Sequence, residues 1–86
     1  MEINNLIKKV KKKICDKIVC EKVSIEDKTF LHQRHKNFDP KKFHLKITIE
    51  SSELKSKNKI EANRYIYTVL KEELKINIHS IQLLIN

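Results

Sequence analysis

Glycine is absent from the 86-residue sequence, and proline occurs once, at Pro40. Glycine-rich phosphate-binding loops and dinucleotide-binding motifs need glycine where the backbone adopts a positive φ or closely approaches the ligand. The sequence therefore excludes both kinds of nucleotide site. It also lacks an apolar run near the roughly 20 residues that cross a membrane, and it shows no signal-peptide pattern. We accordingly expect a soluble cytoplasmic protein with no membrane contact, and an organellar location stays open.

Cysteine is also scarce, with only Cys15 and Cys20 present. A disulfide-stabilised scaffold of this length would contain more cysteines, so we expect two reduced thiols that pack as small, half-buried apolar groups. Together with His32 and His35, the two cysteines approximate the spacing of a zinc finger. The histidine pair is one residue too close, however, and Cys15 ends a predicted helix instead of entering a hairpin. The pattern favours packing over zinc.

Arginine is rare in a strongly basic chain. Lys and Arg total 19 against 11 Asp and Glu, a net charge of +8, yet only Arg34 and Arg64 are arginine. The excess charge would attract phosphates, anionic lipids or an acidic protein. Because arginine is the residue that reads guanine or phosphate through two parallel hydrogen bonds, its scarcity weakens the case for specific nucleic-acid binding.

The length and composition predict a single domain over residues 1–86 that is not an enzyme. Apolar residues make up 40% of the chain, which supports one thin core but not two. None of the serines lies in a recognisable nucleophile elbow. The adjacent carboxylates of Glu26 and Asp27 would point to opposite faces of a strand, which is poor geometry for an acid–base pair.

The first half of the chain alternates between helical and strand patterns. Apolar residues three and four apart predict a helix over residues 3–16, with lysines mostly on its other side. Val19, Val23 and Ile25 share one face of a strand that ends near Asp27. Residues 28–42 show no periodicity and predict an ordered, exposed loop. Strict alternation from residue 43 to 50 predicts a second strand whose polar face carries His44.

The second half predicts one long helix and a last strand. Residues 51–58 are polar and break the pattern. A helix follows over residues 60–74, with an inward stripe that includes Ile60, Tyr67 and Leu70 and with a solvated end around Glu73. Residues 78–85 alternate again and place His79 on the core-facing side of a strand that completes the sheet. The predicted order is α-β-β-α-β.

Four segments of the sequence resemble the BolA-like protein family. Residues 26–35 are similar to the family's acidic-Ser-x-x-His-x-x-His loop, with Thr29 in place of serine. His44-Leu45 and the residues to Ser52 are similar to its His-Phe strand. Residues 62–67 occupy its Arg-His-Arg helix segment, of which only Arg64 is kept. Residues 70–74 and 78–81 match its Leu-x-Glu-Glu-Leu helix end and Ile-His-Ala-Leu strand.

The resemblance implies an α+β fold of the second KH-like type, α-β-β-α-(α)-β, with a three-stranded mixed sheet and helices on one face. It implies an adaptor in iron–sulfur trafficking or iron and redox sensing that binds a monothiol glutaredoxin. The two proteins would share a two-iron two-sulfur cluster, with the active-site cysteine of the partner and a glutathione thiol as ligands. This chain would contribute His79 and His32, with His35 in reserve, and hold no cluster alone.

An alternative function is that of a KH-like nucleic-acid-binding transcriptional regulator, with Arg64, Lys57 and Lys59 as the contacts. KH domains clamp the nucleic-acid backbone with a Gly-x-x-Gly loop. Because this chain has no glycine, the adaptor is favoured, and only weak, charge-driven nucleic-acid binding is expected. We expect His44 to face solvent or the binding groove, where a structural role and a ligand role are equally compatible with it.

Overall fold

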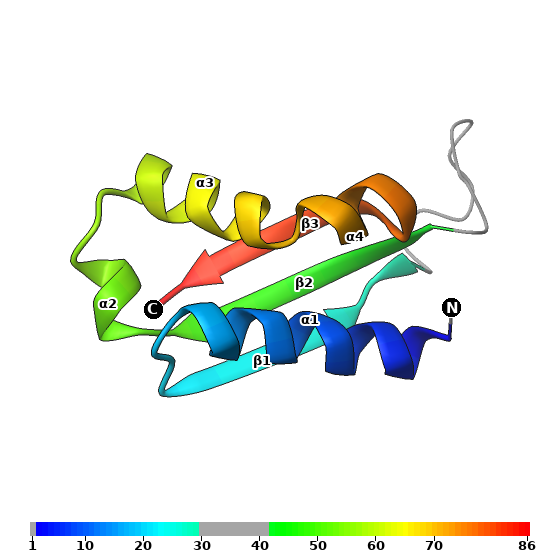
Figure 1. The fold of residues 1–86 in the computed structure, drawn as a ribbon, viewed down its shortest axis with the longest axis horizontal. Helices are drawn as coiled ribbons and strands as arrows, with labels where there is room; N and C mark the ends of the chain where they lie inside the picture. The colour runs from blue at the N-terminus through cyan, green and yellow to red at the C-terminus, as the bar shows by residue number, and fades with distance from the viewer. Residues whose placement is uncertain (1, 30–41) are drawn as a thin grey trace.

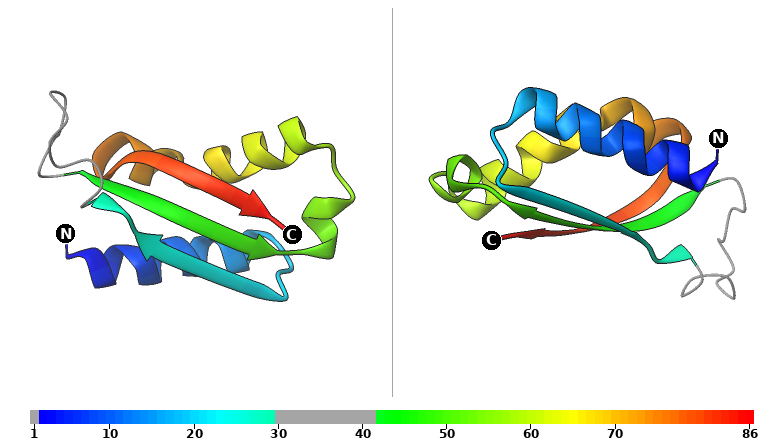
Figure 2. Two further views of the ribbon diagram at one scale, coloured as in Figure 1. Left: turned by 180° about the vertical axis from the view of Figure 1, so that it is seen from behind. Right: turned by 90° about the horizontal axis from the view of Figure 1, so that it is seen from below.

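A computed structural model describes residues 2–29 and 42–86, and these residues form three strands and four helices. The order is α1 (Ile3–Lys17), β1 (Lys22–Asp27), β2 (Phe43–Glu50), α2 (Ser52–Lys55), α3 (Lys59–Val69), α4 (Lys71–Ile76) and β3 (Ile78–Ile85) (Figure 1). The sheet order is β1-β2-β3, with β1 antiparallel and β3 parallel to β2. Figure 2 shows α1, α3 and α4 on one face of this mixed sheet, so the predicted fold class is confirmed.

The core lies between the sheet and these helices. The apolar stripe predicted for the first helix is correct, since Leu6, Val10 and Ile14 are fully buried. Leu45, Ile47 and Ile49 of β2 are buried opposite them, because alternate residues of a strand share one face. No helix among the described residues is long and apolar enough to span a membrane.

The first strand is shorter than predicted, because it begins at Lys22. Val19 is 75% exposed and lies outside it. Its N–H donates to Glu53 Oε2 and its carbonyl accepts from Ser51 Oγ, at 2.9 and 2.8 Å. These side chains occupy the backbone groups that a strand would offer to β2, so the ladder starts only at the Glu21 N–H, 2.8 Å from the Glu50 carbonyl.

The segment predicted as a polar break contains a short helix. Ser51 caps α2 by accepting a hydrogen bond from the Leu54 N–H at 3.2 Å, and Leu54 is buried in the core. Serine is a favoured N-cap residue because its side chain satisfies one of the free N–H groups of the first turn. Asn58 caps α3 in the same way through the Glu61 N–H.

The predicted long helix is two helices that meet at Leu70. Leu70 is fully buried but has φ −100° and ψ 17°, outside the helical range, so the axis changes direction there. The inward stripe of α3 consists of Ala62 and Ile66, and the stripe predicted over this segment was wrong in part. Ile60 is 71% and Tyr67 40% exposed.

Every described turn is built without a left-handed residue. None of the described residues has a positive φ. Ser56 after α2 and Asn77 after α4 both keep right-handed helical angles. The chain therefore reverses at these places in conformations open to all residue types, which is consistent with the absence of glycine.

Glu73, predicted to be solvated, is buried in an ion-pair cluster between α4 and α1. Its side chain lies 2.7 Å from Lys13 Nζ and 3.3 Å from Lys9 Nζ. Burial alone would raise the pKa of the Glu73 carboxyl. Hydrogen bonds from Lys13, from the Glu73 backbone and from Lys9, together with the charge of Lys13, outweigh burial, and the pKa lies below its ordinary value. The contact also raises the pKa of Lys13. The cluster therefore links α4 to α1.

Replacing Glu73 by glutamine should lower the free energy of unfolding by about 1.5–3 kcal/mol at neutral pH, the range for hydrogen bonds to charged groups. Because the pKa of Glu73 is lowered in the folded chain, its contribution is complete above the ordinary value of 4.5 and is lost as the pH falls through the folded-state value. Urea titrations across this range should show the two proteins converging in acid. Glu72→Gln is the control, because Glu72 is exposed and 3.7 Å from Lys13. An equal effect of both variants would contradict the assignment.

Candidate functional site

One end of the sheet gathers the described histidines. β2 and β3 run parallel and start at this end, and antiparallel β1 ends there. The chain leaves the described part after Thr29 and re-enters it at Lys42, next to the start of β2 (Figure 1). The predicted ligands His32 and His35 fall between these points and lie outside the described residues.

A β-bulge at the start of β3 sets the position of His79. Phe43 pairs with Ile78, whereas the next residue, His44, pairs with Ser80, so His79 has no partner in β2. Ile78 is buried and His79 is exposed, which corrects the prediction that His79 faces the core. Bulges commonly re-aim a side chain in this way. The His79 imidazole is consequently accessible at the end of the sheet.

His44 is buried beside His79 and lines the neighbouring pocket, so of the two predicted placements, solvent or a binding groove, it does not face solvent. It is only 6% exposed, and its Nδ1 lies 2.6 Å from Ser80 Oγ. The two imidazole rings are tilted by 51° with their centroids 4.8 Å apart. The His79 ring therefore packs against the buried ring of His44, which Ser80 holds in place.

Hydrogen bonds from the end of β1 hold the His44 backbone. Its N–H donates to Thr29 Oγ1 at 3.2 Å, and its carbonyl accepts from the Lys28 N–H at 2.8 Å. Asp27 Oδ1 accepts from both the N–H and the Oγ1 hydroxyl of Thr29. A carboxylate that binds the backbone two residues on is a common turn device. Thr29 thus fixes the point at which the chain departs toward His32.

The open face next to these histidines carries a basic pocket of about 310 Å³. Lys28 and Lys46 line it together with His44, Ser80 and Gln82. The Glu26 carboxylate is not part of this lining, but its Oε1 lies 3.9 Å from Lys28 Nζ. Among residues 2–29 and 42–86, no three His, Cys, Asp or Glu side chains converge as metal ligands. The described part of this end therefore offers one accessible imidazole near a pocket with two lysines, whose charge Glu26 reduces in part. Such a site suits a ligand that brings further metal donors.

The two cysteines lie near the opposite end of the sheet. Cys15 is exposed in α1, against the prediction of half-buried packing, while Cys20 is half-buried before β1 and packs against the core. The Cys20 thiol lies 3.6 Å from the Ile18 carbonyl, and burial raises its pKa. A raised pKa keeps the thiol protonated, so Cys20 is a poor nucleophile and a poor ligand.

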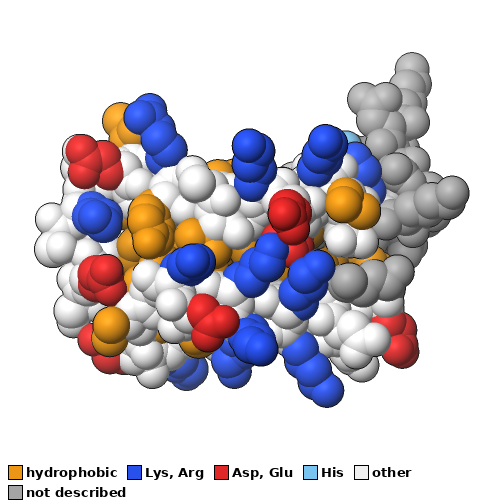
Figure 3. Space-filling model, viewed as in Figure 1, with side chains coloured by type: hydrophobic (Ala, Val, Ile, Leu, Met, Phe, Trp, Pro, Cys, Tyr) orange, Lys and Arg blue, Asp and Glu red, His pale blue; other side chains and the backbone are white. Residues whose placement is uncertain are grey.

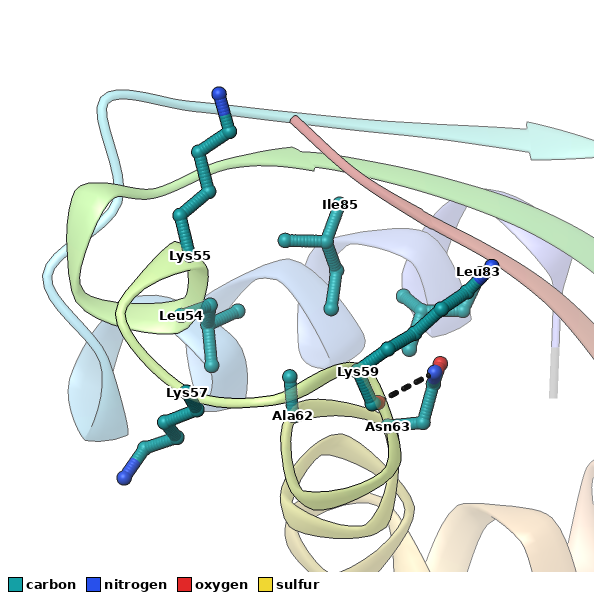
Figure 4. Close-up of a pocket in the computed structure, with 8 residues that line it drawn as sticks. All are labelled: Leu54, Lys55, Lys57, Lys59, Ala62, Asn63, Leu83 and Ile85. Atoms are coloured by element: carbon teal, nitrogen blue, oxygen red, sulfur yellow. Dashed lines mark hydrogen bonds between the residues drawn. The ribbon is translucent and has the colours of Figure 1, made fainter.

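The nucleic-acid candidates also lie away from the histidines. Lys57 and Lys59 line a second pocket, of about 290 Å³, between the α2–α3 turn and the end of β3 (Figure 4). Lys57 Nζ is 5.8 Å from the centroid of the Tyr65 ring. Arg64 is exposed on α3 and does not line this pocket. The structure therefore brings together two of the three predicted contacts.

Sequence comparison decides the family. The profile described as BolA-like protein matches residues 14–86. The chain belongs to the BolA-like family. A search of curated proteins found no match, so the assignment depends on the family profile.

Solved BolA structures share the fold of this BolA-like protein. The BolA domain of SufE1 from Arabidopsis thaliana superposes with a TM-score of 0.80 at 21% identity, covering 100% of this chain and 93% of that one. BolA1 from Arabidopsis thaliana gives a TM-score of 0.76 at 21% identity, covering 92% and 87%. Both the resemblance read from the sequence and its fold class are thus confirmed.

Ser80→Ala should destabilise the protein by about 0.5–1.5 kcal/mol, because it removes the hydrogen-bond partner of the buried His44 Nδ1. The ¹⁵N resonance of Nδ1 should shift with the loss of this bond. Chemical denaturation and imidazole NMR measure the two effects. Ser24→Ala, in the exposed part of β1, is the control and should change neither quantity. An unchanged Nδ1 resonance in Ser80→Ala would show that the contact is absent in solution.

Proposed function

We propose that this BolA-like protein is an adaptor, not an enzyme, that binds a monothiol glutaredoxin and shares a two-iron two-sulfur cluster with it. The observation that supports this most directly is the exposed His79 imidazole, displaced from the ladder by the bulge and resting on buried His44. It lies at the end of the sheet from which the chain leaves toward His32 and His35.

The donor chemistry of this end fits one side of such a cluster. Histidines replace two thiolates on one iron in the clusters of Rieske proteins, which raises the reduction potential. His79 and His32 would be the ligands from this chain, with His35 in reserve, and the glutaredoxin cysteine and a glutathione thiol would complete the set. When bound, the cluster supplies one-electron chemistry and transferable iron and sulfide.

The other residues at this end of the sheet orient the His79 ring and attract a negatively charged partner. His44 limits the rotation of the His79 ring through its own contact with Ser80. Lys28 and Lys46 line the pocket next to His44 and Ser80. Their positive charge, reduced by Glu26 at 3.9 Å from Lys28 Nζ, favours a partner whose thiolates and glutathione carboxylates are negative. Neutral imidazole is the form that ligates metal and is the main form of an ordinary histidine at neutral pH.

The nucleic-acid alternative receives less support from the structure. The turn between α2 and α3, where Lys57 lies, contains no glycine that would let a phosphate backbone approach. Lys and Arg side chains are spread over the helical face instead of forming one patch (Figure 3). Such a distribution favours weak, sequence-independent attraction.

Reconstitution with iron, sulfide, glutathione and a monothiol glutaredoxin should produce a visible circular dichroism spectrum that differs from that of glutaredoxin alone. His79→Ala should abolish this difference and keep the fold, because the His79 side chain is exposed. Leu84→Ala, an exposed position of β3 outside this pocket, is the matched control and should keep the spectrum. Far-UV circular dichroism checks folding.

The loop histidines are tested in the same assay. His32→Ala should weaken the spectrum partially if His35 substitutes, whereas the double variant His32→Ala/His35→Ala should abolish it. A stable chromophore formed by this protein without glutaredoxin would contradict the proposal. So would an unchanged spectrum in folded His79→Ala.

DNA binding should depend on charge and not on sequence. We expect a Kd of about 10⁻⁴–10⁻⁶ M near physiological salt. The affinity should fall steeply between about 50 and 200 mM salt, and by a similar factor for duplexes of unrelated sequence. Fluorescence anisotropy measures both. A preference of about a thousandfold for one sequence, lost in Arg64→Ala, would instead support the transcriptional regulator.

A further inference from the structure

The far end of β3 has backbone groups that face away from the sheet. The Asn86 N–H donates to the Ile49 carbonyl and the Asn86 carbonyl accepts from the Ser51 N–H, so residue 86 points toward β2. Successive residues of a strand alternate in direction, and Leu83 and Ile85 therefore point outward. The Ile81 carbonyl agrees with this alternation, because it accepts from the Tyr67 hydroxyl on α3 at 3.2 Å.

Beyond Ile81, no described residue pairs with this outward edge. β3 is an edge strand that is bonded on one side to β2 alone, and no hydrogen bond from residues 2–29 or 42–86 reaches the N–H or carbonyl of Leu83 or Ile85. The Tyr67 hydroxyl occupies the outward carbonyl of Ile81 but does not bond to Leu83 or Ile85. Exposed edges of this kind accept an added strand.

The same two residues form part of the pocket of about 290 Å³ near the start of α3. Figure 4 shows Leu83 and Ile85 directed toward Leu54 and Ala62, which supply an apolar floor. On one face of a sheet, side chains of neighbouring strands lie about 5 Å apart. A strand added at this edge would place a side chain beside Leu83, over that floor.

The charge around the pocket has one sign. Its lining includes Lys55, Lys57 and Lys59 and no Asp or Glu. Figure 4 shows Lys59 extending across the pocket toward Leu83, while Lys55 and Lys57 point outward. The carboxylate of Glu53, which belongs to the same short helix as Lys55, is occupied by the Val19 N–H. The edge thus combines unpaired backbone groups, an apolar floor and a cationic rim.

We propose that β3 binds an extended, acidic segment of a partner protein as a fourth strand along Leu83 to Ile85. The backbone of the segment pairs with the outward N–H and carbonyl groups, one apolar side chain enters the pocket, and acidic side chains meet the lysines. This mode of recognition combines main-chain hydrogen bonds for affinity with a side-chain pocket for specificity. It is independent of the proposed cluster site, because Leu83 and Ile85 lie roughly 13–20 Å along β3 from His79.

The observations favour a peptide over two other occupants. A second copy of this chain would bring a further net charge of +8, which repels at close range. A nucleic acid has no main chain that can complete a strand ladder, and the neighbouring turn lacks glycine for close phosphate approach. Both occupants are outcomes of the test below.

Amide hydrogen exchange on ¹⁵N-labelled protein tests the proposal without any mutation. The probe is a blocked seven-residue peptide in which glutamate alternates with valine. In the free protein, the Leu83 and Ile85 amides should exchange faster than those of Gln82 and Leu84, which point to β2. At a peptide concentration about ten times the Kd, exchange of the Leu83 and Ile85 amides should slow about tenfold.

Matched probes and variants separate backbone pairing from charge attraction. A peptide N-methylated on the edge-facing amides should not bind, because it cannot donate to β3. Leu83→Pro should keep the fold, since it removes an N–H that β2 does not use, and should lose the peptide. Lys59→Glu should weaken binding roughly fivefold or more, while Lys71→Glu, the same change on α4, should not.

Several results would overturn the proposal. They are no peptide binding at millimolar concentration, equal binding of the N-methylated peptide, and binding that leaves exchange at Leu83 and Ile85 unchanged. Protection of these amides by an eight-nucleotide oligothymidylate instead of the peptide would assign the edge to nucleic acid. Protection that grows with the concentration of the protein alone would assign it to a second copy. None of these results would affect the glutaredoxin reconstitution, so the two proposals fail separately.

Discussion

The pairing of β2 with both neighbours is the constraint on which the rest of the structure depends. β2 follows β1 in the chain and is antiparallel to it, so the two strands need no crossover between them. β3 is parallel to β2 and must be reached by a crossover. The helices α2, α3 and α4 make this crossover and cover the buried face on the way (Figure 1). As a result β3 starts next to the start of β2, and His79 comes to lie against His44 although 34 residues separate them along the chain.

Local patterns in the sequence predict much of this fold. The stripe of Leu6, Val10 and Ile14 and the alternation through Ile47 and Ile49 are each set by one element burying one face, and both were correct. Two of the wrong predictions have long-range causes. Glu73 is buried because Lys9 and Lys13 reach it from α1, 60 residues earlier in the case of Lys13. Val19 leaves the strand because Ser51 and Glu53 occupy its backbone.

The position of His79 in the chain was available from the sequence, but the geometry around it was not. The BolA resemblance named His79 from the Ile-His segment, and the chain is a member of that family. That His79 is exposed and His44 is buried follows from a one-residue shift in register between β2 and β3. A bulge of this kind cannot be recognised from the alternation of apolar and polar residues in either strand. The alternation therefore placed His79 on the wrong face of β3. The contact between His44 and Ser80 becomes visible only once that register is known.

None of the described residues has a positive φ, so none of them requires glycine. The absence of glycine in turn restricts the conformations of the unfolded chain. Glycine gives an unfolded polypeptide many conformations that folding must then remove, and replacing glycine where the native backbone tolerates it stabilises a protein by about 0.4–1 kcal/mol. A chain without any glycine begins folding from a narrower ensemble. This domain is small and buries only a small core, which limits the stability gained from burial. The lower conformational entropy of its unfolded state compensates for part of that deficit.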